Sequence, residues 1–182
     1  MVTSRPELEL PLERRSACAV LRHAEQSAIC SLACVLLVRD TIGDETSQMT
    51  ISNERVIEIF RGLENGDGAA FFEHVADGVD WTVMGTHPLA GHYRSKQAFI
   101  DGTFAKLGRV LTDGVQLRVE HLLVKGDQAV VELHSLATAR SGMRFDNRYC
   151  WVVEFRDGIV VSVRAYLDSA MVARLFDENP IL

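Results

Sequence analysis

The sequence lacks an excess of basic side chains. Its 182 residues contain 19 lysines and arginines against 25 aspartates and glutamates, so the formal net charge is -6 at pH 7. A protein that binds a nucleic-acid backbone needs surplus positive charge to displace counterions from phosphates. We therefore expect no nucleic-acid partner, and acidic polymers are disfavoured as substrates for the same reason.

Paired cysteines and cofactor motifs are also missing. None of the four cysteines forms a Cys-x-x-Cys pair, and a chain that is 47% apolar can bury a core without a disulfide framework. A reducing cytoplasm is the simplest location to expect. The sequence has no His-Glu-x-x-His motif and no glycine-rich phosphate loop, so we expect no metal site and no cofactor.

Glycine is scarce in the first 50 residues, which hold one of the 13 glycines and three of the four cysteines. This shift in composition predicts an N-terminal extension over residues 1–50, partly helical or disordered. A globular domain is expected over residues 51–178, followed by a tail over residues 179–182. One alternative stays open, namely that Met49 is the functional start and the first 48 residues are not part of the native protein.

Within the extension, apolar or small residues recur at helical spacing between Ala17 and Leu36. This spacing predicts an amphipathic helix of roughly 20 residues. Arg22, His23 and Glu25 interrupt the apolar run that a signal peptide or a membrane span would need. We therefore expect no membrane partner.

Helix signals become regular beyond residue 51. Ser52 suits the N-cap of a helix that ends at Asn65-Gly66, Asp67 suits the cap of a second short helix, and Ser95 suits the cap of a third. The apolar positions expected to face the core are Val56, Ile59, Phe60, Leu63, Phe99, Ile100, Phe104 and Leu107.

Alternation of apolar and polar residues predicts the strands. The expected ranges are 79–84, 115–124, 128–138, 145–155 and 159–166, with a short helix over 169–176 at the end. Helices segregated from consecutive hairpin-linked strands indicate an α+β fold, in which a strongly curved antiparallel sheet wraps around helices. Such a sheet leaves a cone-shaped cavity at its open end, where a ligand is expected to bind.

This order of elements, with the stretches WTVMGTHPLAGHYRSKQAF (81–99) and NRYCWVVEFRDGIVVSVRAYLD (147–168), resembles the nuclear transport factor 2-like superfamily. Within it, the SnoaL-like polyketide cyclase and ketosteroid isomerase-related branch is the most similar. The resemblance covers about residues 51–178 and implies a cystatin-like α+β barrel. It also implies cofactor-free acid/base chemistry of the isomerase, cyclase or hydratase/hydrolase type on a hydrophobic cyclic carbonyl or epoxide compound. Since this superfamily uses one cone for many purposes, a non-catalytic ligand-binding or dimerisation module is the alternative.

The resemblance disfavours ketosteroid isomerisation itself. That reaction needs a carboxylate base and a protonated carboxylic acid as an oxyanion donor. The corresponding positions here fall on or near Gly85 and Trp151, and neither side chain can play those parts.

Two other branches point to Asp168. Limonene epoxide hydrolase uses an Asp-Arg-Asp trio, whose acids correspond to Asp168 and Glu132. Its bridging arginine would fall at Val130, with Arg148 on the neighbouring strand as a substitute, and this departure puts hydrolysis in doubt. SnoaL-like cyclases rely chiefly on an aspartate at the end of the last strand, which Asp168 matches, although Tyr166 stands where a histidine is frequent.

The candidate catalytic residues are Asp168, Glu132 and His87. A carboxylate at the cavity mouth would have its pKa raised by partial desolvation, so Asp168 could shuttle a proton. As the residue before a helix it is equally suited to be an N-cap. Glu132 could orient the substrate or a water if its face of the strand lines the cavity, and strand alternation leaves that facing open. His87 lies in the loop expected to rim the cavity and could titrate near neutral pH.

Aromatic rings and one arginine complete the expected site. Aromatic walls and phenol donors suit a small cyclic or polyketide-like ligand. The candidate substrate-binding residues are Trp81, Tyr93, Arg148, Trp151 and Tyr166.

A homodimer is the expected assembly. We expect the outer face of the sheet to carry Val131 and Leu133, and a two-fold partner would cover such an apolar face.

Overall fold

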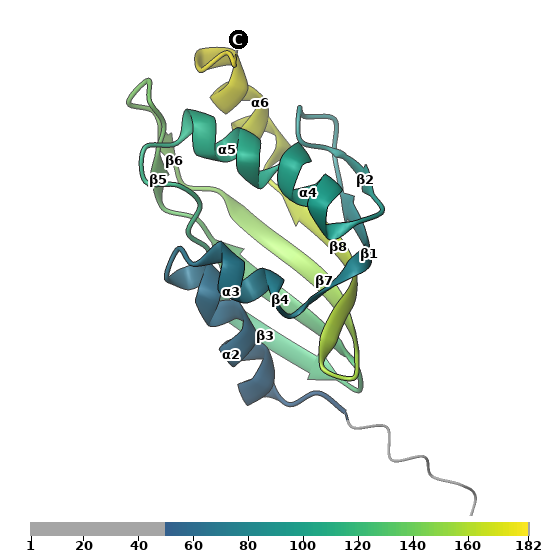
Figure 1. Cartoon of the computed structure of the whole chain (residues 1–182). Coiled ribbons are helices and arrows are strands. Elements are labelled where there is room, and N and C mark those ends of the chain that lie inside the picture. The colour runs from purple at the N-terminus through teal and green to yellow at the C-terminus, as the bar shows by residue number, and fades with distance from the viewer. Residues whose placement is uncertain (1–49, 182) are drawn as a thin grey trace, which may run out of the picture. The chain divides into compact units, whose positions relative to one another are not determined.

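Residues 50–181 are described by the structure, a computed structural model (Figure 1), and they lie within the unit Ser47–Leu182. The amphipathic helix expected between Ala17 and Leu36 lies outside the described residues. Within them, no helix is long and apolar enough to cross a membrane.

The first two described helices begin where capping chemistry predicts. Helix α2 (Asn53–Glu64) starts at Ser52, whose hydroxyl accepts a hydrogen bond from the Arg55 N–H at 3.2 Å. Helix α3 (Gly68–Phe72) starts at Asp67, whose carboxylate accepts from the Ala70 N–H. The second helix is shorter than expected, because Val75 already belongs to the first strand.

The third predicted helix is divided in two. Helix α4 (Lys96–Gly102) and helix α5 (Phe104–Val110) meet at Thr103, whose backbone is not helical, with φ −128° and ψ −76°. The Thr103 hydroxyl donates to the Phe99 carbonyl at 2.6 Å, so this side chain stabilises the break. The last helix, α6 (Ser169–Glu178), begins after the final long strand as predicted.

Six strands form one curved sheet in the order β2-β1-β8-β7-β4-β3. They are β1 (Val75–Val83), β2 (Gly91–Tyr93), β3 (Arg118–Lys125), β4 (Gln128–His134), β7 (Arg148–Arg156) and β8 (Ile159–Leu167). All neighbours are antiparallel except β1 and β8, which are parallel. The predicted α+β class and the run of long antiparallel strands are confirmed. Two predicted strands are broken, however, since β5 (Ala137–Thr138) and β6 (Arg144–Phe145) form a separate small sheet.

The helices cover one face of the sheet. Figure 1 shows α2 to α5 in front of the strands and α6 at one end of the sheet. The covered face packs against α2, α3 and α4 in a large apolar cluster, while a second cluster lies between α5, α6 and the β5–β6 hairpin. We call the covered face the inner face and the opposite one the outer face.

The structure corrects one expectation about these faces. Val131 and Leu133 lie on the inner face, where they are 0% and 1% exposed, and not on the outer face. Along β4, Ala129, Val131 and Leu133 are buried at alternate positions and contribute to the large cluster. Glu132 and His134 lie at the positions between them and point to the outer face. The prediction that a dimer forms through an outer face carrying Val131 and Leu133 is therefore wrong.

Candidate functional site

An apolar cavity of about 40 Å³ lies where the two clusters meet. Its lining side chains come from the inner face of the sheet, from α4, α5 and α6, and from the loops between these elements. They are Val83, Leu89, Phe99, Thr103, Phe104, Leu107, Val115, Leu117, Phe145, Tyr149, Trp151, Ala165, Leu167 and Val172. No charged side chain of residues 50–181 belongs to this lining.

Two of the lining side chains carry a donor that makes no hydrogen bond within residues 50–181, although the surface of the cavity itself is almost entirely apolar. Trp151 is 3% exposed, and its indole Nε1 has no hydrogen-bond partner among the described residues. The Tyr149 hydroxyl likewise makes no hydrogen bond within residues 50–181. Burial raises the pKa of Tyr149 far above its usual range, so its phenol stays protonated at neutral pH. The third polar group, the Thr103 hydroxyl, is already bonded to a backbone carbonyl.

The structure places Trp81 and Tyr93 behind the cavity. The Trp81 ring stacks on Phe99 with centroids 3.7 Å apart and meets Trp151 edge-on at 5.1 Å, but Trp81 does not line the cavity. Tyr93 donates its hydroxyl hydrogen to the Leu89 carbonyl at 2.9 Å. Of the predicted aromatic walls, only Trp151 lies in the cavity wall itself.

His87 clamps the loop between β1 and β2. It is buried, its Nε2 donates to the Met84 carbonyl at 3.1 Å, and its Nδ1 accepts from the Leu89 N–H at 3.2 Å. Because Nδ1 acts as an acceptor, the ring is in its neutral Nε2–H form. Burial lowers the pKa of His87, opposed by the hydrogen bond to Met84. Both ring nitrogens are thus engaged with the backbone, and His87 is not in the cavity lining.

Asp168 caps helix α6, and its side chain is exposed rather than partly desolvated at a cavity mouth as the sequence led us to expect. Its Oδ1 accepts from the N–H groups of Ala170 and Met171 at 3.0 and 3.1 Å. Its Oδ2 makes no hydrogen bond to the residues that the structure describes. Leu167 and Val172, which flank it in sequence, both line the cavity. Asp168 is therefore adjacent in sequence to a residue of the cavity wall but does not contribute to the lining.

Gly85 lies close to the start of α6 and has a left-handed backbone with φ +113°. A Cβ at this position would lie 2.4 Å from the Ser169 hydroxyl oxygen. The backbone therefore excludes a side chain at the position expected for the base of a ketosteroid isomerase, as the sequence already suggested.

The other predicted residues lie together on the outer face of the sheet. Glu132, Arg148 and Tyr166 line an open depression of about 260 Å³ with Glu120 and Cys150. The structure thus brings these three together, but on the opposite side of the sheet from Trp151.

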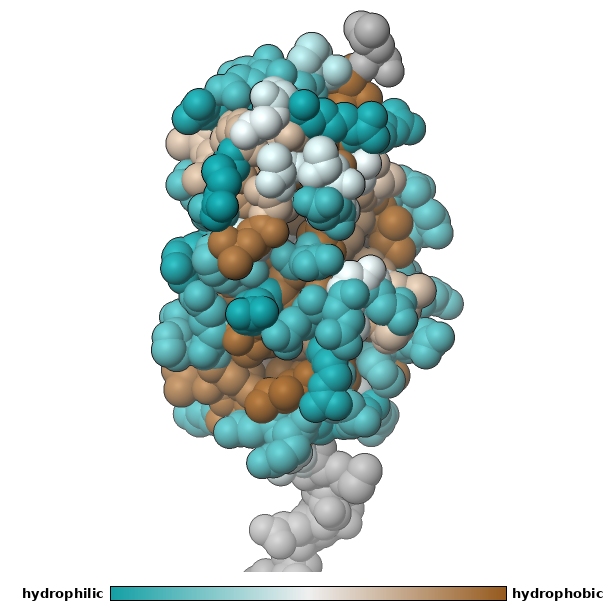
Figure 2. All heavy atoms as spheres, turned by 90° about the vertical axis from the view of Figure 1, so that its left-hand side faces the viewer, coloured by the Kyte–Doolittle hydropathy of each residue, from teal (hydrophilic) through white to brown (hydrophobic). Residues whose placement is uncertain are grey.

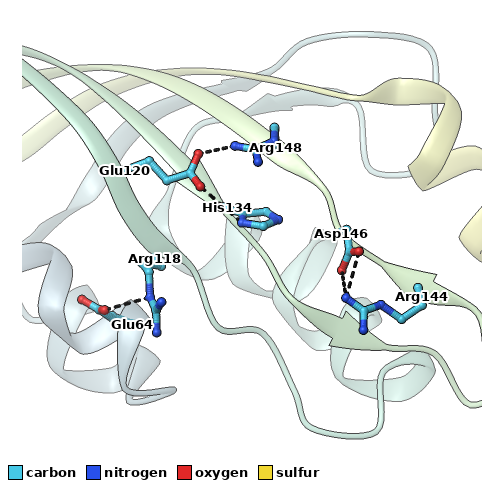
Figure 3. Close-up of polar contacts among 7 residues, drawn as sticks. All are labelled: Glu64, Arg118, Glu120, His134, Arg144, Asp146 and Arg148. Atoms are coloured by element: carbon cyan, nitrogen blue, oxygen red, sulfur yellow. Dashed lines mark hydrogen bonds and ion pairs between the residues drawn. The ribbon is translucent and has the colours of Figure 1, made fainter.

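Glu120, on β3, joins two neighbouring strands on this face. Figure 3 shows its carboxylate between Arg148 of β7 and His134 of β4, with His134 Nδ1 3.3 Å from Glu120 Oε1. The same view shows two further ion pairs, Arg118 with Glu64 and Arg144 with Asp146. These pairs have exposed members, so each contributes little to stability.

The surface has no dominant apolar patch on the side shown in Figure 2, where hydrophobic side chains form separate patches between hydrophilic ones. The large apolar residues exposed within residues 50–181 are Ile57, Leu123, Leu136 and Tyr166. No three His, Cys, Asp or Glu side chains of this range are arranged to hold a metal ion.

Sequence reasoning missed Tyr149. The signal that could have found it is its spacing of two from Trp151, which places both rings on the same face of β7. It also missed Glu120, which a register shift between β3 and β4 turns toward the outer face.

Comparison with known families identifies the domain. A family model described as a SnoaL-like domain matches residues 56–163. The chain belongs to the SnoaL-like family. The matched part of this SnoaL-like chain includes Tyr149 and Trp151 and ends before Asp168.

Two fungal proteins are similar to this SnoaL-like chain. Dimerizing cyclase phiC from a fungal species is 27% identical over 135 residues, which are 72% of this chain and 59% of that protein. Dimerizing cyclase tstC from Talaromyces stipitatus is 28% identical over 142 residues, which are 75% of this chain and 62% of that protein. The match thus spans about three-fifths of the length of these relatives.

Solved structures confirm the fold. A nuclear transport factor 2-like protein from Burkholderia thailandensis has 27% identity and a TM-score of 0.60, covering 68% of this chain and 95% of its own. TerC, crystallized with polyporic acid, has 21% identity and a TM-score of 0.57, covering 68% and 96%. A protein with a cystatin-like fold from Xanthomonas campestris has 17% identity and a TM-score of 0.54, covering 68% and 95%. The SnoaL-like chain therefore has the cystatin-like α+β fold of this superfamily.

Proposed function

We propose that this SnoaL-like protein is a cofactor-independent enzyme that cyclises or isomerises a hydrophobic carbonyl or epoxide compound in its apolar cavity. The observation that supports the proposal most is the cavity itself, which is lined almost entirely by carbon and lies between the inner face of the sheet and helices α4, α5 and α6. The similarity to two dimerizing cyclases favours a reaction that forms a ring.

An apolar cavity suits cyclisation for two physical reasons. It holds a flexible apolar chain in a folded conformation, which removes part of the entropic barrier to ring closure. It also excludes water, so a reactive carbanion or carbocation is less readily quenched. At about 40 Å³ the cavity holds only a water or two, so its walls must move apart to admit a cyclic compound.

Asp168 is the acid/base group that we propose for proton transfer. It follows Leu167 of the cavity wall in the sequence, and one of its carboxylate oxygens is not used by the helix cap. We assign no part in the reaction to His87, whose ring nitrogens are both bonded to backbone, or to Glu132, which faces outward.

A non-catalytic binding module is the second candidate. The observation that favours it is the absence of Asp, Glu, His, Lys and Arg from the cavity lining within residues 50–181. In that case Asp168 would serve only as a helix cap.

A panel of three small test compounds separates the two candidates. The protein is incubated with acetonylacetone, which closes to methylcyclopentenone with loss of water, with a β,γ-unsaturated cyclohexenone, which isomerises to its conjugated form, and with cyclohexene oxide, which isomerises to 2-cyclohexenol. We expect faster conversion of at least one compound than in buffer, measured by gas chromatography.

The matched control is Ala165→Val, which fills the cavity with a residue that suits a strand. The proposal expects this variant to fold and to lose the acceleration. Conversion of none of the compounds, or equal conversion by Ala165→Val, would refute catalysis in this cavity and leave the binding module.

We also retain a homodimer as a proposal, on grounds different from those drawn from the sequence. The outer face carries Tyr166, 45% exposed, and Leu123, 73% exposed, near the partly exposed Val130, Cys150 and Val152. A second copy of the chain would cover this apolar centre.

A further inference from the structure

The loop between β1 and β2 forms part of the cavity wall. It contributes Leu89, whose side chain is 3% exposed and lines the cavity. Leu89 also belongs to the apolar cluster between α5, α6 and the β5–β6 hairpin. Because the walls of the cavity must move apart to admit a cyclic compound, displacement of this loop is one way to open it.

Two side-chain hydrogen bonds hold the backbone of Leu89. Its N–H donates to His87 Nδ1 at 3.2 Å, and its carbonyl oxygen accepts from the Tyr93 hydroxyl at 2.9 Å. The His87 ring is fixed in turn by its Nε2–H, which donates to the Met84 carbonyl at 3.1 Å. The Met84 N–H donates to the Ala165 carbonyl on β8 at 2.9 Å. His87 therefore connects Leu89 to the sheet.

Only the neutral form of His87 can make both of its hydrogen bonds. Protonation places a hydrogen on Nδ1 as well, so this nitrogen then faces the Leu89 N–H as a second donor. The bond to Leu89 is lost, whereas the bond to the Met84 carbonyl is kept. An open loop, in which the ring is free of Leu89, consequently takes up a proton more readily than the closed loop.

No charged side chain competes with this effect at the ring. His87 is 5% exposed, and the two influences on its pKa, burial and the Met84 hydrogen bond, both come from uncharged groups. The titratable neighbours are Tyr93, whose pKa is raised by burial, and Asp168, which is exposed at the start of α6 near Gly85. Of these groups, only the histidine is of a type that changes charge between about pH 5 and pH 7.5.

We propose that His87 controls the entry of ligands to the cavity, because its neutral form holds Leu89 in the wall and its protonated form releases Leu89 so that the wall opens. This inference rests on the proposed function, since it requires a cavity that admits a ligand. His87 does not line the cavity, so it is a positioning residue that acts through Leu89. Ligand entry should accelerate as the pH falls below about 6.5, the usual pKa of histidine.

Nuclear magnetic resonance tests this control on the full chain with cyclopentanone, a small neutral ring compound that suits an apolar cavity. The sequence contains two tryptophans, and triple-resonance experiments assign the indole N–H signal of Trp151, which lies in the cavity wall. The line shape of this signal reports the association rate. We expect association about fivefold faster at pH 5 than at pH 7.5, as for the loss of one hydrogen bond. Circular dichroism at each pH checks that the chain stays folded.

Three variants separate the bond to Leu89 from other effects of pH. His87→Asn keeps an acceptor for the N–H two residues further on, as in an Asx-turn, but does not titrate, so entry should be slow at both pH values. His87→Ala removes the acceptor, so entry should be fast at both. The control is His92→Gln, which removes an exposed histidine paired with Asp80 and should keep the pH dependence of the wild type. If His87→Ala does not fold, the wild type and His87→Asn decide the question.

Two kinds of result would overturn the inference. Equal association rates of the wild type at the two pH values, or a pH dependence that His87→Asn retains, would refute control by His87 and leave the proposed function of the cavity standing. Binding of cyclopentanone at neither pH would also refute this control, and absence of conversion of the three test compounds would then refute the proposed function as well.

Discussion

Asn147 holds the backbone of Asp168 with its buried side-chain amide. Its Oδ1 accepts from the Asp168 N–H at 3.1 Å, and its Nδ2 lies 3.5 Å from the Asp168 carbonyl oxygen. The Asn147 carbonyl in turn accepts from the Ser135 N–H at 2.8 Å. This residue therefore ties together the end of β4, the start of β7 and the end of β8, beside the cavity.

Replacing Asn147 should destabilise the fold. Asn147→Ala removes both side-chain contacts and leaves the Asp168 amide unpaired, so we expect a loss of about 2 kcal/mol in the free energy of unfolding. Urea denaturation followed by tryptophan fluorescence measures it. The neighbouring Asp146→Ala, which breaks only the exposed pair with Arg144, should change stability by less than about 0.5 kcal/mol. Equal effects of the two variants would contradict the role of Asn147.

Asp168→Asn separates capping from proton transfer. Asparagine keeps an oxygen for the two N–H groups at the start of α6, so stability should stay within about 0.5 kcal/mol, whereas Asp168→Ala should lose about 1 kcal/mol. If Asp168 transfers the proton, turnover of whichever test compound is converted should fall roughly a hundredfold in Asp168→Asn. Normal turnover by this variant would reduce Asp168 to a helix cap.

The part of the fold set by local chemistry was predictable from sequence. Ser52 and Asp67 cap helices as expected, and alternation identified the long strands. Which face of a strand meets the helices was not predictable, because alternation fixes only relative facing. For that reason Val131 and Leu133 were wrongly expected on the outer face, and the facing of Glu132 stayed open.

The candidate site was predictable only in part, for the same reason. Trp151 lies in the cavity wall, whereas Arg148 and Tyr166 lie on the outer face. The break at Thr103 and the clamp formed by His87 depend on tertiary hydrogen bonds, which periodicity does not reveal.

Burial of His87 should make stability depend on pH. Its pKa is lowered from a usual value of 6.5, so the unfolded chain takes up a proton more readily than the folded protein. The stability that depends on neutral His87 is therefore fully present above about pH 6.5. It is lost as the pH falls from there toward the lower pKa that His87 has in the folded protein. We expect a lower free energy of unfolding at about pH 5 than at about pH 7.5, by chemical denaturation, and a smaller difference in His87→Gln. An unchanged difference in that variant would mean that other groups cause the dependence.

A charged residue introduced on the outer face tests whether two copies of the chain associate through that face. Val152 lies on the outer face of the central strand β7, whereas the exposed Ile57 lies on α2, which packs on the inner face. We expect light scattering to show a dimer at micromolar concentration for the wild type and Ile57→Arg, and a monomer for Val152→Arg, because a buried unpaired charge opposes association. A monomeric wild type would refute the dimer, and dissociation by Ile57→Arg alone would place the interface elsewhere.

Opening of the cavity should depend on the C-terminal end of α6. Asn179 accepts a hydrogen bond from the Ser141 N–H at 2.8 Å and donates to the Ser141 hydroxyl and to the Leu175 carbonyl, so it fastens α6 to the β5–β6 hairpin. Helix α6 contributes Val172 to the cavity wall, and Phe145 of the hairpin forms another part of it. Because the closed cavity is too small for a cyclic ligand, some of its walls must move apart, and we expect these two elements to separate when a ligand enters.

Asn179→Ala should therefore speed ligand entry. The loss of about 1 kcal/mol of hydrogen bonding would make the open form roughly five times more populated, and cyclopentanone should associate faster by that factor. Nuclear magnetic resonance line shapes of the Trp151 indole signal measure the exchange rate. Arg174→Ala, which breaks only an exposed pair with Glu178 on the same helix, should leave the rate unchanged. Equal rates in the wild type and Asn179→Ala would show that the ligand enters by another route.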